Sequence, residues 1–188
     1  MLLLTGCPRS GTGYAAQVFQ AQGLAIGHEC MGVDGVSSWQ FAVIDKHYPW
    51  HQTDERRDRY DFTVILHQVR DPLAVLASMQ VLRRPDWTFI ARHLELPKGD
   101  LARRITFYLE WMAICDRQAH YCYRVEDLPT EWPQLHQLCG GQAQWTPAAA
   151  AIQHTYNHRR HAPLTWEKVL ASPRGAEVFA KARLYGYD

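Results

Sequence analysis

The chain begins with MLLLTGCPRSGTGY, residues 1–14, and the start of the fold follows from this stretch. Residues 2–5 are apolar and predict a short buried strand. Apolar residues then recur at helical spacing over 12–22, and Gly23 is a suitable stop for that helix. A glycine-rich loop joins the two elements. The N-terminus therefore predicts a strand, a tight loop and a helix in direct succession.

The loop GCPRSGTG, residues 6–13, has the composition of an anion-binding turn. Glycines let backbone N–H groups approach a ligand closely, and the following helix adds its positive end. Arg9 supplies a guanidinium, while Ser10 and Thr12 supply hydroxyl donors. Thr12 stands where the GxxxxGK[ST] loop requires Lys, which disfavours hydrolysis of nucleoside triphosphates. Taken alone, the loop is also compatible with a tight turn that binds nothing.

Strand and helix patterns alternate along the rest of the chain. FTVILHQV, residues 62–69, is a continuous apolar run typical of a strand buried on both faces. Further patterns predict strands at 24–27 and 121–125, a loop at 48–61, and helices at 36–44, 72–83, 101–119, 165–171 and 174–184. This order predicts an α/β fold, with a central parallel sheet flanked by helices, in a single domain over residues 1–188.

Composition excludes several classes of protein. With 47% hydrophobic residues the chain is too apolar to be disordered, and a net charge of +1 argues against a nucleic acid partner. The five cysteines lack CxxC spacing, and the histidines form no HExxH pattern, so we expect neither a disulfide framework nor a metal. We find no targeting leader and no apolar run near 18 residues, so we expect a cytoplasmic protein without a membrane partner.

A second basic motif follows the apolar strand. Arg70 stands where that strand ends, at the edge where open α/β sheets bind ligands, and Ser78 comes eight residues later. If both side chains converge on one anion, Arg70 offers a bidentate contact and Ser78 a hydroxyl. The alternative is that Arg70 pairs with a carboxylate and Ser78 is a small packed residue.

Together, PRSGTGY (8–14) and RDPLAVLAS (70–78) resemble the nucleotide-binding motifs of sulfotransferases that use 3′-phosphoadenosine 5′-phosphosulfate (PAPS). YRVEDL (123–128) is similar to a third, less specific motif of that family. The resemblance implies a P-loop-like sulfotransferase fold and transfer of a sulfuryl group to a hydroxyl or amine, leaving adenosine 3′,5′-bisphosphate (PAP). The nucleotide-binding residues that it implies are Pro8, Arg9, Ser10, Gly11, Thr12, Gly13, Tyr14, Arg70, Ser78, Tyr123 and Arg160.

Within this resemblance, the loop would hold the 5′-phosphosulfate, and Arg70 with Ser78 would hold the 3′-phosphate. Arg9 would stabilise the charge on the departing phosphate oxygen. The chain departs from the family at Val125, where many members have an aromatic residue against the adenine, so adenine recognition stays open. The basic stretch 157–161, which contains Arg160, either supplies positive charge over the nucleotide or is a solvated loop.

Transfer to a hydroxyl requires a base that takes the hydroxyl proton. Glu29, twenty residues after Arg9, is the preferred candidate, since protein-tyrosine and heparan-type sulfotransferases resemble this arrangement. His47 resembles the histidine of cytosolic small-molecule sulfotransferases, and His28 could act as base, orient Glu29 or contact the acceptor.

The acceptor, a small molecule or a carbohydrate, is not identified by the sequence, and neither is the oligomeric state. Candidate acceptor contacts are Trp39, Tyr48, Trp50, His51, Trp87 and Phe89, although aromatic residues more often pack in cores. Two other classes stay open. One is a P-loop nucleotide kinase or another protein that binds nucleoside triphosphates, with Asp71 as a Mg²⁺ ligand; the other is a nucleotide-binding module without turnover.

Overall fold

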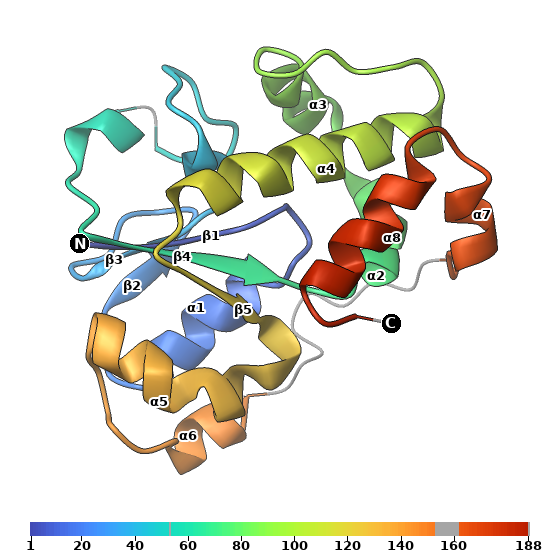
Figure 1. The fold of residues 1–188 in the computed structure, drawn as a ribbon. Helices are drawn as coiled ribbons and strands as arrows, with labels where there is room; N and C mark the ends of the chain where they lie inside the picture. The colour runs from blue at the N-terminus through green and yellow to red at the C-terminus, as the bar shows by residue number, and fades with distance from the viewer. Residues whose placement is uncertain (53, 153–161, 188) are drawn as a thin grey trace.

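The structure is a computed structural model that describes residues 1–52, 54–152 and 162–187 (Figure 1). Within these residues, five strands form one parallel sheet in the order β2-β3-β1-β4-β5. The strands are β1 (Leu2–Thr5), β2 (Ile26–His28), β3 (Gly35–Ser37), β4 (Val64–Val69) and β5 (Tyr121–Arg124). The predicted α/β fold with a central parallel sheet flanked by helices is confirmed.

Helices cover both faces of the sheet (Figure 1). They are α1 (Thr12–Ala21), α2 (Pro72–Ser78), α3 (Arg84–Ile90), α4 (Asp100–Gln118), α5 (Leu128–Cys139), α6 (Pro147–Ala150), α7 (Trp166–Leu170) and α8 (Gly175–Leu184). In the described ranges, no helix combines the length and the apolar character needed to cross a membrane.

The side chains of β1 alternate between two buried cores. Leu2 and Leu4 point to the face covered by α1, α5 and α6, where Trp132 is completely buried. Leu3 points to the opposite face, which packs against α4 and α8 and contains the buried Trp111. Because β1 is central and both its faces are covered, its residues are apolar without interruption.

Two of the expected elements differ in the structure. The helix expected over 36–44 is wrong, because Val36 belongs to strand β3 and a short 3-10 turn follows at Gln40–Ala42. Val36, Trp39 and Val43 have the i, i+3, i+7 spacing of a helix face, and that spacing hid the short strand. The helix expected over 72–83 ends at Ser78 and continues only as a 3-10 turn, Met79–Val81.

Candidate functional site

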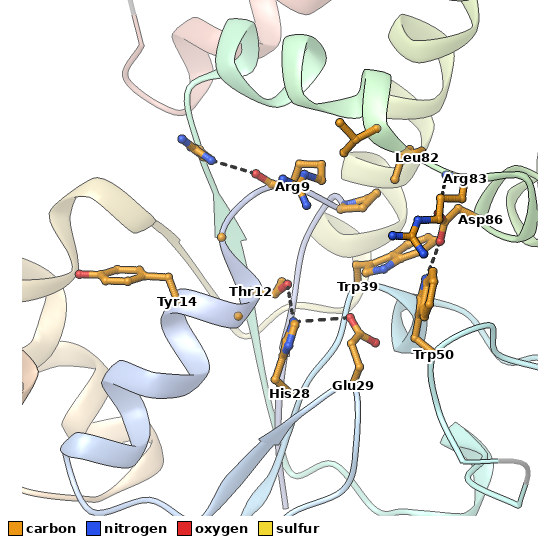
Figure 2. Close-up of a pocket in the computed structure, with 15 residues that line it drawn as sticks. Arg9, Thr12, Tyr14, His28, Glu29, Trp39, Trp50, Leu82, Arg83 and Asp86 are labelled. Carbon is orange, nitrogen blue, oxygen red and sulfur yellow. Dashed lines mark hydrogen bonds and ion pairs between the residues drawn. The ribbon is translucent and has the colours of Figure 1, made fainter. Parts of the chain in front are cut away.

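The carboxyl ends of the parallel strands meet at one edge of the sheet, and a cavity of about 430 Å³ opens there. One side of the cavity is the loop between β1 and α1, and the other comes from residues after β3 and around the start of α3 (Figure 2). The lining residues are Pro8, Arg9, Gly11, Thr12, Gly13, Tyr14, His28, Glu29, Trp39, Trp50, Arg70, Val81, Leu82, Arg83 and Asp86.

The loop after β1 is pressed against the end of β4. A Cβ atom at Gly6 would lie 2.3 Å from the carbonyl oxygen of Gln68, so only glycine fits there. Gly11, the residue before α1, has a φ of 93°, a left-handed conformation that favours glycine. Arg9 has a φ of 75°, which is uncommon for a residue with a side chain and is found often at functional sites.

Side chains from the sheet support this loop from behind. The Gln68 side-chain amide donates a hydrogen bond of 2.6 Å to the carbonyl of Ser10. Tyr123 in turn donates from its hydroxyl to the Gln68 amide oxygen at 2.8 Å. Tyr123, which the resemblance assigned to the nucleotide, is buried in the core and does not line the cavity. In the structure Tyr123 contacts Gln68, the residue that supports the loop.

The two basic motifs meet at the loop. Arg9 donates through Nε to the Ser78 hydroxyl at 2.8 Å, across 69 residues of sequence. Arg70 donates from a terminal guanidinium nitrogen to the backbone carbonyl of Arg9 at 3.2 Å. The Arg70–Ser78 motif and the glycine loop were predicted to act together, and the structure brings them into direct contact. Ser78 is buried at the end of α2, next to the cavity wall rather than in it.

Ser10 stands apart from the other loop residues. Its side chain is buried, and its hydroxyl has no hydrogen-bond partner in the described part of the chain. A buried hydroxyl without a partner costs free energy, so such groups are uncommon. Ser10 lies in the glycine loop but does not line the cavity.

Glu29 lies directly after β2 and reaches the cavity opposite the loop (Figure 2). Its φ of 53° is left-handed, and its backbone N–H donates to the carbonyl of Ser37. Its Oε2 accepts a hydrogen bond of 2.7 Å from the Ser38 hydroxyl and lies 3.1 Å from Nε2 of His51. The other ring nitrogen of His51 lies 3.0 Å from Oε2 of Glu55. Glu29 is thus a carboxylate held in one orientation.

His51 is the centre of this arrangement and was expected only as an aromatic contact to an acceptor. Its ring is completely buried and stacks on Phe41, with ring centroids 4.1 Å apart. Its Nε2 lies 2.8 Å from the Ser38 hydroxyl, with which it forms a hydrogen bond, and 3.1 Å from Oε2 of Glu29, while its Nδ1 faces Glu55. The ring therefore orients Glu29 from behind instead of touching the cavity.

The two candidate histidines are separated in the structure. His28 lines the cavity, with Nε2 3.4 Å from the Thr12 hydroxyl and 3.9 Å from Oε1 of Glu29. His47 lies in a separate surface depression with Tyr48, Pro49 and Arg84, and it does not line the cavity. His28 and Glu29 are therefore placed together near the loop, and His47 is not.

The wall opposite the loop is built around Trp50. Its indole N–H donates to Oδ1 of the buried Asp86 at 2.6 Å, while Oδ2 accepts from the backbone N–H of Arg83. Trp50 keeps 44% of its surface exposed, and the Arg83 guanidinium carbon lies 5.8 Å from its ring centroid. Trp39 completes this wall, whereas Phe89 is completely buried and Trp87 lies in another groove.

A second polar cluster lies on the other side of β4. His67, Asp116 and Cys122 come within 4.8 Å of one another, the one such group of possible metal ligands in the described residues. Asp116 already accepts hydrogen bonds from His67, Lys181 and Tyr185. The ammonium group on its carboxylate makes the cluster a poor site for a cation, and the contacts instead join β4, α4 and α8.

Arg160 and the stretch 157–161 lie outside the described residues, so the structure places neither. A comparison of the chain with family models, with curated proteins and with solved structures found no match in any of the three. Chemically, the cavity brings two guanidinium side chains, Arg9 and Arg70, together with an oriented carboxylate at Glu29. Such an arrangement can hold an anionic group while a nearby proton is removed.

Proposed function

We propose that the chain is a sulfotransferase that transfers a sulfuryl group from PAPS to the hydroxyl of an acceptor. The observation that carries the proposal is the meeting of the glycine loop, Arg70 and Ser78 on one side of a cavity whose other side holds Glu29. The P-loop-like sulfotransferase fold belongs to the same proposal, and the parallel sheet with a glycine loop after β1 supports it.

The loop and its partners would bind the nucleotide. Backbone N–H groups at the start of α1 and the positive end of this helix suit the 5′-phosphosulfate. Arg70 uses one of its five N–H donors on the Arg9 carbonyl, which leaves others for the 3′-phosphate. Ser78 accepts from Arg9 and would act on the nucleotide through that guanidinium, which it holds at the cavity wall.

The reaction exchanges one S–O bond for another. The acceptor oxygen attacks sulfur in line, the bond between sulfur and the bridging phosphate oxygen breaks, and PAP departs. The acceptor proton passes to the carboxylate of Glu29, which Ser38 and His51 orient. Arg9, on the loop side, stabilises the negative charge that develops on the bridging oxygen.

Calorimetric titration of the purified protein with PAP, and separately with ATP plus Mg²⁺, tests the donor site. We expect tight binding of PAP and much weaker binding of ATP. Binding of ATP without PAP would replace the proposal with a nucleotide kinase or another nucleoside triphosphate-binding protein. Binding of PAP without turnover, after acceptors have been screened with radiolabelled PAPS, would indicate a nucleotide-binding module.

A further inference from the structure

Positive charge gathers beside the cavity although the whole chain is almost neutral. The chain has a net charge of +1, yet the groove next to the cavity is lined by four cations and one carboxylate. The cations are Arg84, Arg92, Lys98 and Arg103, and the carboxylate is Asp100. This concentration of one sign on one surface favours an anionic ligand.

The groove and the cavity share no lining residue, but adjacent residues of one segment line the two. Arg83 lines the cavity and Arg84 lines the groove, and the two residues are consecutive at the start of α3. Arg92 pairs with Asp45, and Arg103 pairs with Asp100. In the described part of the chain, the exposed Arg84 and Lys98 make no ion pair, so their charges are not neutralised by a neighbouring carboxylate.

Trp50 gives the cavity a fixed flat surface at the same end. Asp86 accepts the indole N–H, which sets the orientation of a ring that is 44% exposed. A rigid, exposed indole offers a large contact area to another ring at little entropic cost. Arg83 lies beside this ring and has no ion pair within the described ranges. One wall thus combines a stacking surface with an arginine.

We propose that the acceptor is an acidic sugar chain, that is, linked sugar rings that carry carboxylate groups. This inference rests on the proposed function, because it takes the Trp50 side of the cavity as the acceptor side. A sugar ring would stack on Trp50 with its carboxylate on Arg83 and a hydroxyl toward Glu29. The following rings would run along the groove past Arg84 and Lys98.

A matched pair of ligands tests the first ring. 4-Nitrophenyl β-D-glucuronide and 4-nitrophenyl β-D-glucoside differ in one carboxylate, and their binding can be followed by ligand-observed NMR with and without PAP. We expect the glucuronide to bind about tenfold more tightly, as for a charge-assisted hydrogen bond. Arg83→Gln should abolish this preference and Trp50→Ala should weaken both ligands, whereas Arg183→Gln, on the exposed face of α8, should change neither.

An oligomer tests the groove. A hyaluronan hexasaccharide should bind more tightly than the single ring, and the double variant Arg84→Gln/Lys98→Gln should remove that gain while leaving the monosaccharide unaffected. A six-nucleotide single-stranded DNA serves as the competing polyanion. Tighter binding of the DNA than of the hexasaccharide would overturn the proposal in favour of nucleic acid.

Three further results would overturn the acidic sugar proposal. They are equal affinities for the two glycosides, no binding of either glycoside, and an unchanged preference for the glucuronide in Arg83→Gln. The two proposals fail separately. A preference for the glucuronide without PAP binding would refute the sulfotransferase proposal and keep the acidic sugar site. PAP binding without a preference for the glucuronide would refute the acidic sugar site and keep the sulfotransferase proposal.

Discussion

Arg70 holds the loop and faces the cavity at the same time. Its guanidinium donates to the Arg9 carbonyl, and its position after β4 puts it among the cavity residues. A single substitution at this residue therefore tests whether the cavity binds a phosphate there.

We expect Arg70→Ala to weaken PAP binding by about 30-fold or more, because truncating a buried charged contact costs about 2–5 kcal/mol. Isothermal titration calorimetry measures the affinity. Arg183→Ala removes an exposed arginine from α8 and should leave the affinity unchanged. An affinity for PAP that survives Arg70→Ala would remove Arg70 from the nucleotide site.

Glu29 is the carboxylate that the cavity places opposite the loop. Glu29→Gln keeps the shape of the side chain but cannot take a proton at the same oxygen. We expect turnover of PAPS with an identified acceptor to fall by about 100-fold or more, with PAP affinity near that of the unchanged protein. Glu167→Gln, at an exposed position on α7, is the matched control. Near-normal turnover in Glu29→Gln would assign the base elsewhere, with His28 as the next residue to test.

His51 acts through Glu29 and is therefore a positioning residue. His51→Ala should lower kcat while the KM for PAPS stays constant, because it removes the ring behind Ser38 and Glu29 that holds the carboxylate in place, and this ring contacts no cavity residue other than Glu29. His51→Gln can still donate an N–H to Glu29 and should restore part of kcat. If both variants lost activity in proportion to a loss of folded protein, followed by circular dichroism, the role would be structural only.

Sequence reasoning singled out the loop, Arg70, Ser78 and Glu29 because each lies in a local motif or directly after a strand, and the structure brings these segments to one cavity, with Ser78 behind its wall. It did not find the contact among Glu29, Ser38, His51 and Glu55, which joins three segments through side chains. No spacing along the chain encodes that meeting, since the loop expected over 48–61 has no periodic pattern.

At the scale of elements, the sequence predicted the short strands β1 and β5 as well as longer segments, but it did not predict the helices α3 and α5 or the strand β3. The predicted helix 101–119 corresponds to α4, and the run 62–69 contains β4. The three-residue strand β3 was missed, because only its pairing with β1 and β2 makes it a strand. Tertiary contacts outweigh local preference in such short segments.

The close approach of the β1 loop to β4 gives a test at this scale. In Gly6→Ala the new Cβ would meet the Gln68 carbonyl at 2.3 Å, so either the loop or the strand must move. We expect a lower urea midpoint and weaker PAP binding together. Gly99→Ala is the control, because its φ of 95° imposes left-handed strain but no atom lies within 4 Å of the added Cβ. Equal effects of the two variants would show that clash at the loop is not the cause.

At the scale of the whole molecule, two carboxylates connect distant segments. Asp45 accepts hydrogen bonds from Arg92 and His93, which joins the segment after β3 to the end of α3. Asp116 joins α4 to β4 through His67 and to α8 through Lys181. Folding gives both ionised carboxylates hydrogen bonds from cationic or N–H groups. Protonating either carboxylate is therefore expected to lower the free energy of unfolding.

The pKa shifts set the direction of this dependence. Burial by itself raises the pKa of Asp45, but hydrogen bonds from the His47 backbone N–H, Arg92 and His93 outweigh it and lower the pKa to about 2. Burial likewise opposes the hydrogen bonds from His67 and Lys181, which hold the pKa of Asp116 well below its usual range. The unfolded chain therefore takes up protons at a higher pH than the folded chain does.

It follows that the free energy of unfolding is at its full value above the ordinary carboxyl pKa of 3.8 and falls as the pH drops below it. For Asp45 the loss is about 2 kcal/mol and is complete only when the pH lies below its folded-state pKa of about 2. Urea unfolding at pH 7, 4, 3 and 2 measures it. Asp45→Asn and Asp116→Asn should each lower stability at pH 7 and flatten the acid dependence, whereas Asp61→Asn, at an exposed carboxylate that makes no ion pair in the described residues, should do neither. An acid dependence equally steep in all three variants would place the responsible groups elsewhere in the molecule.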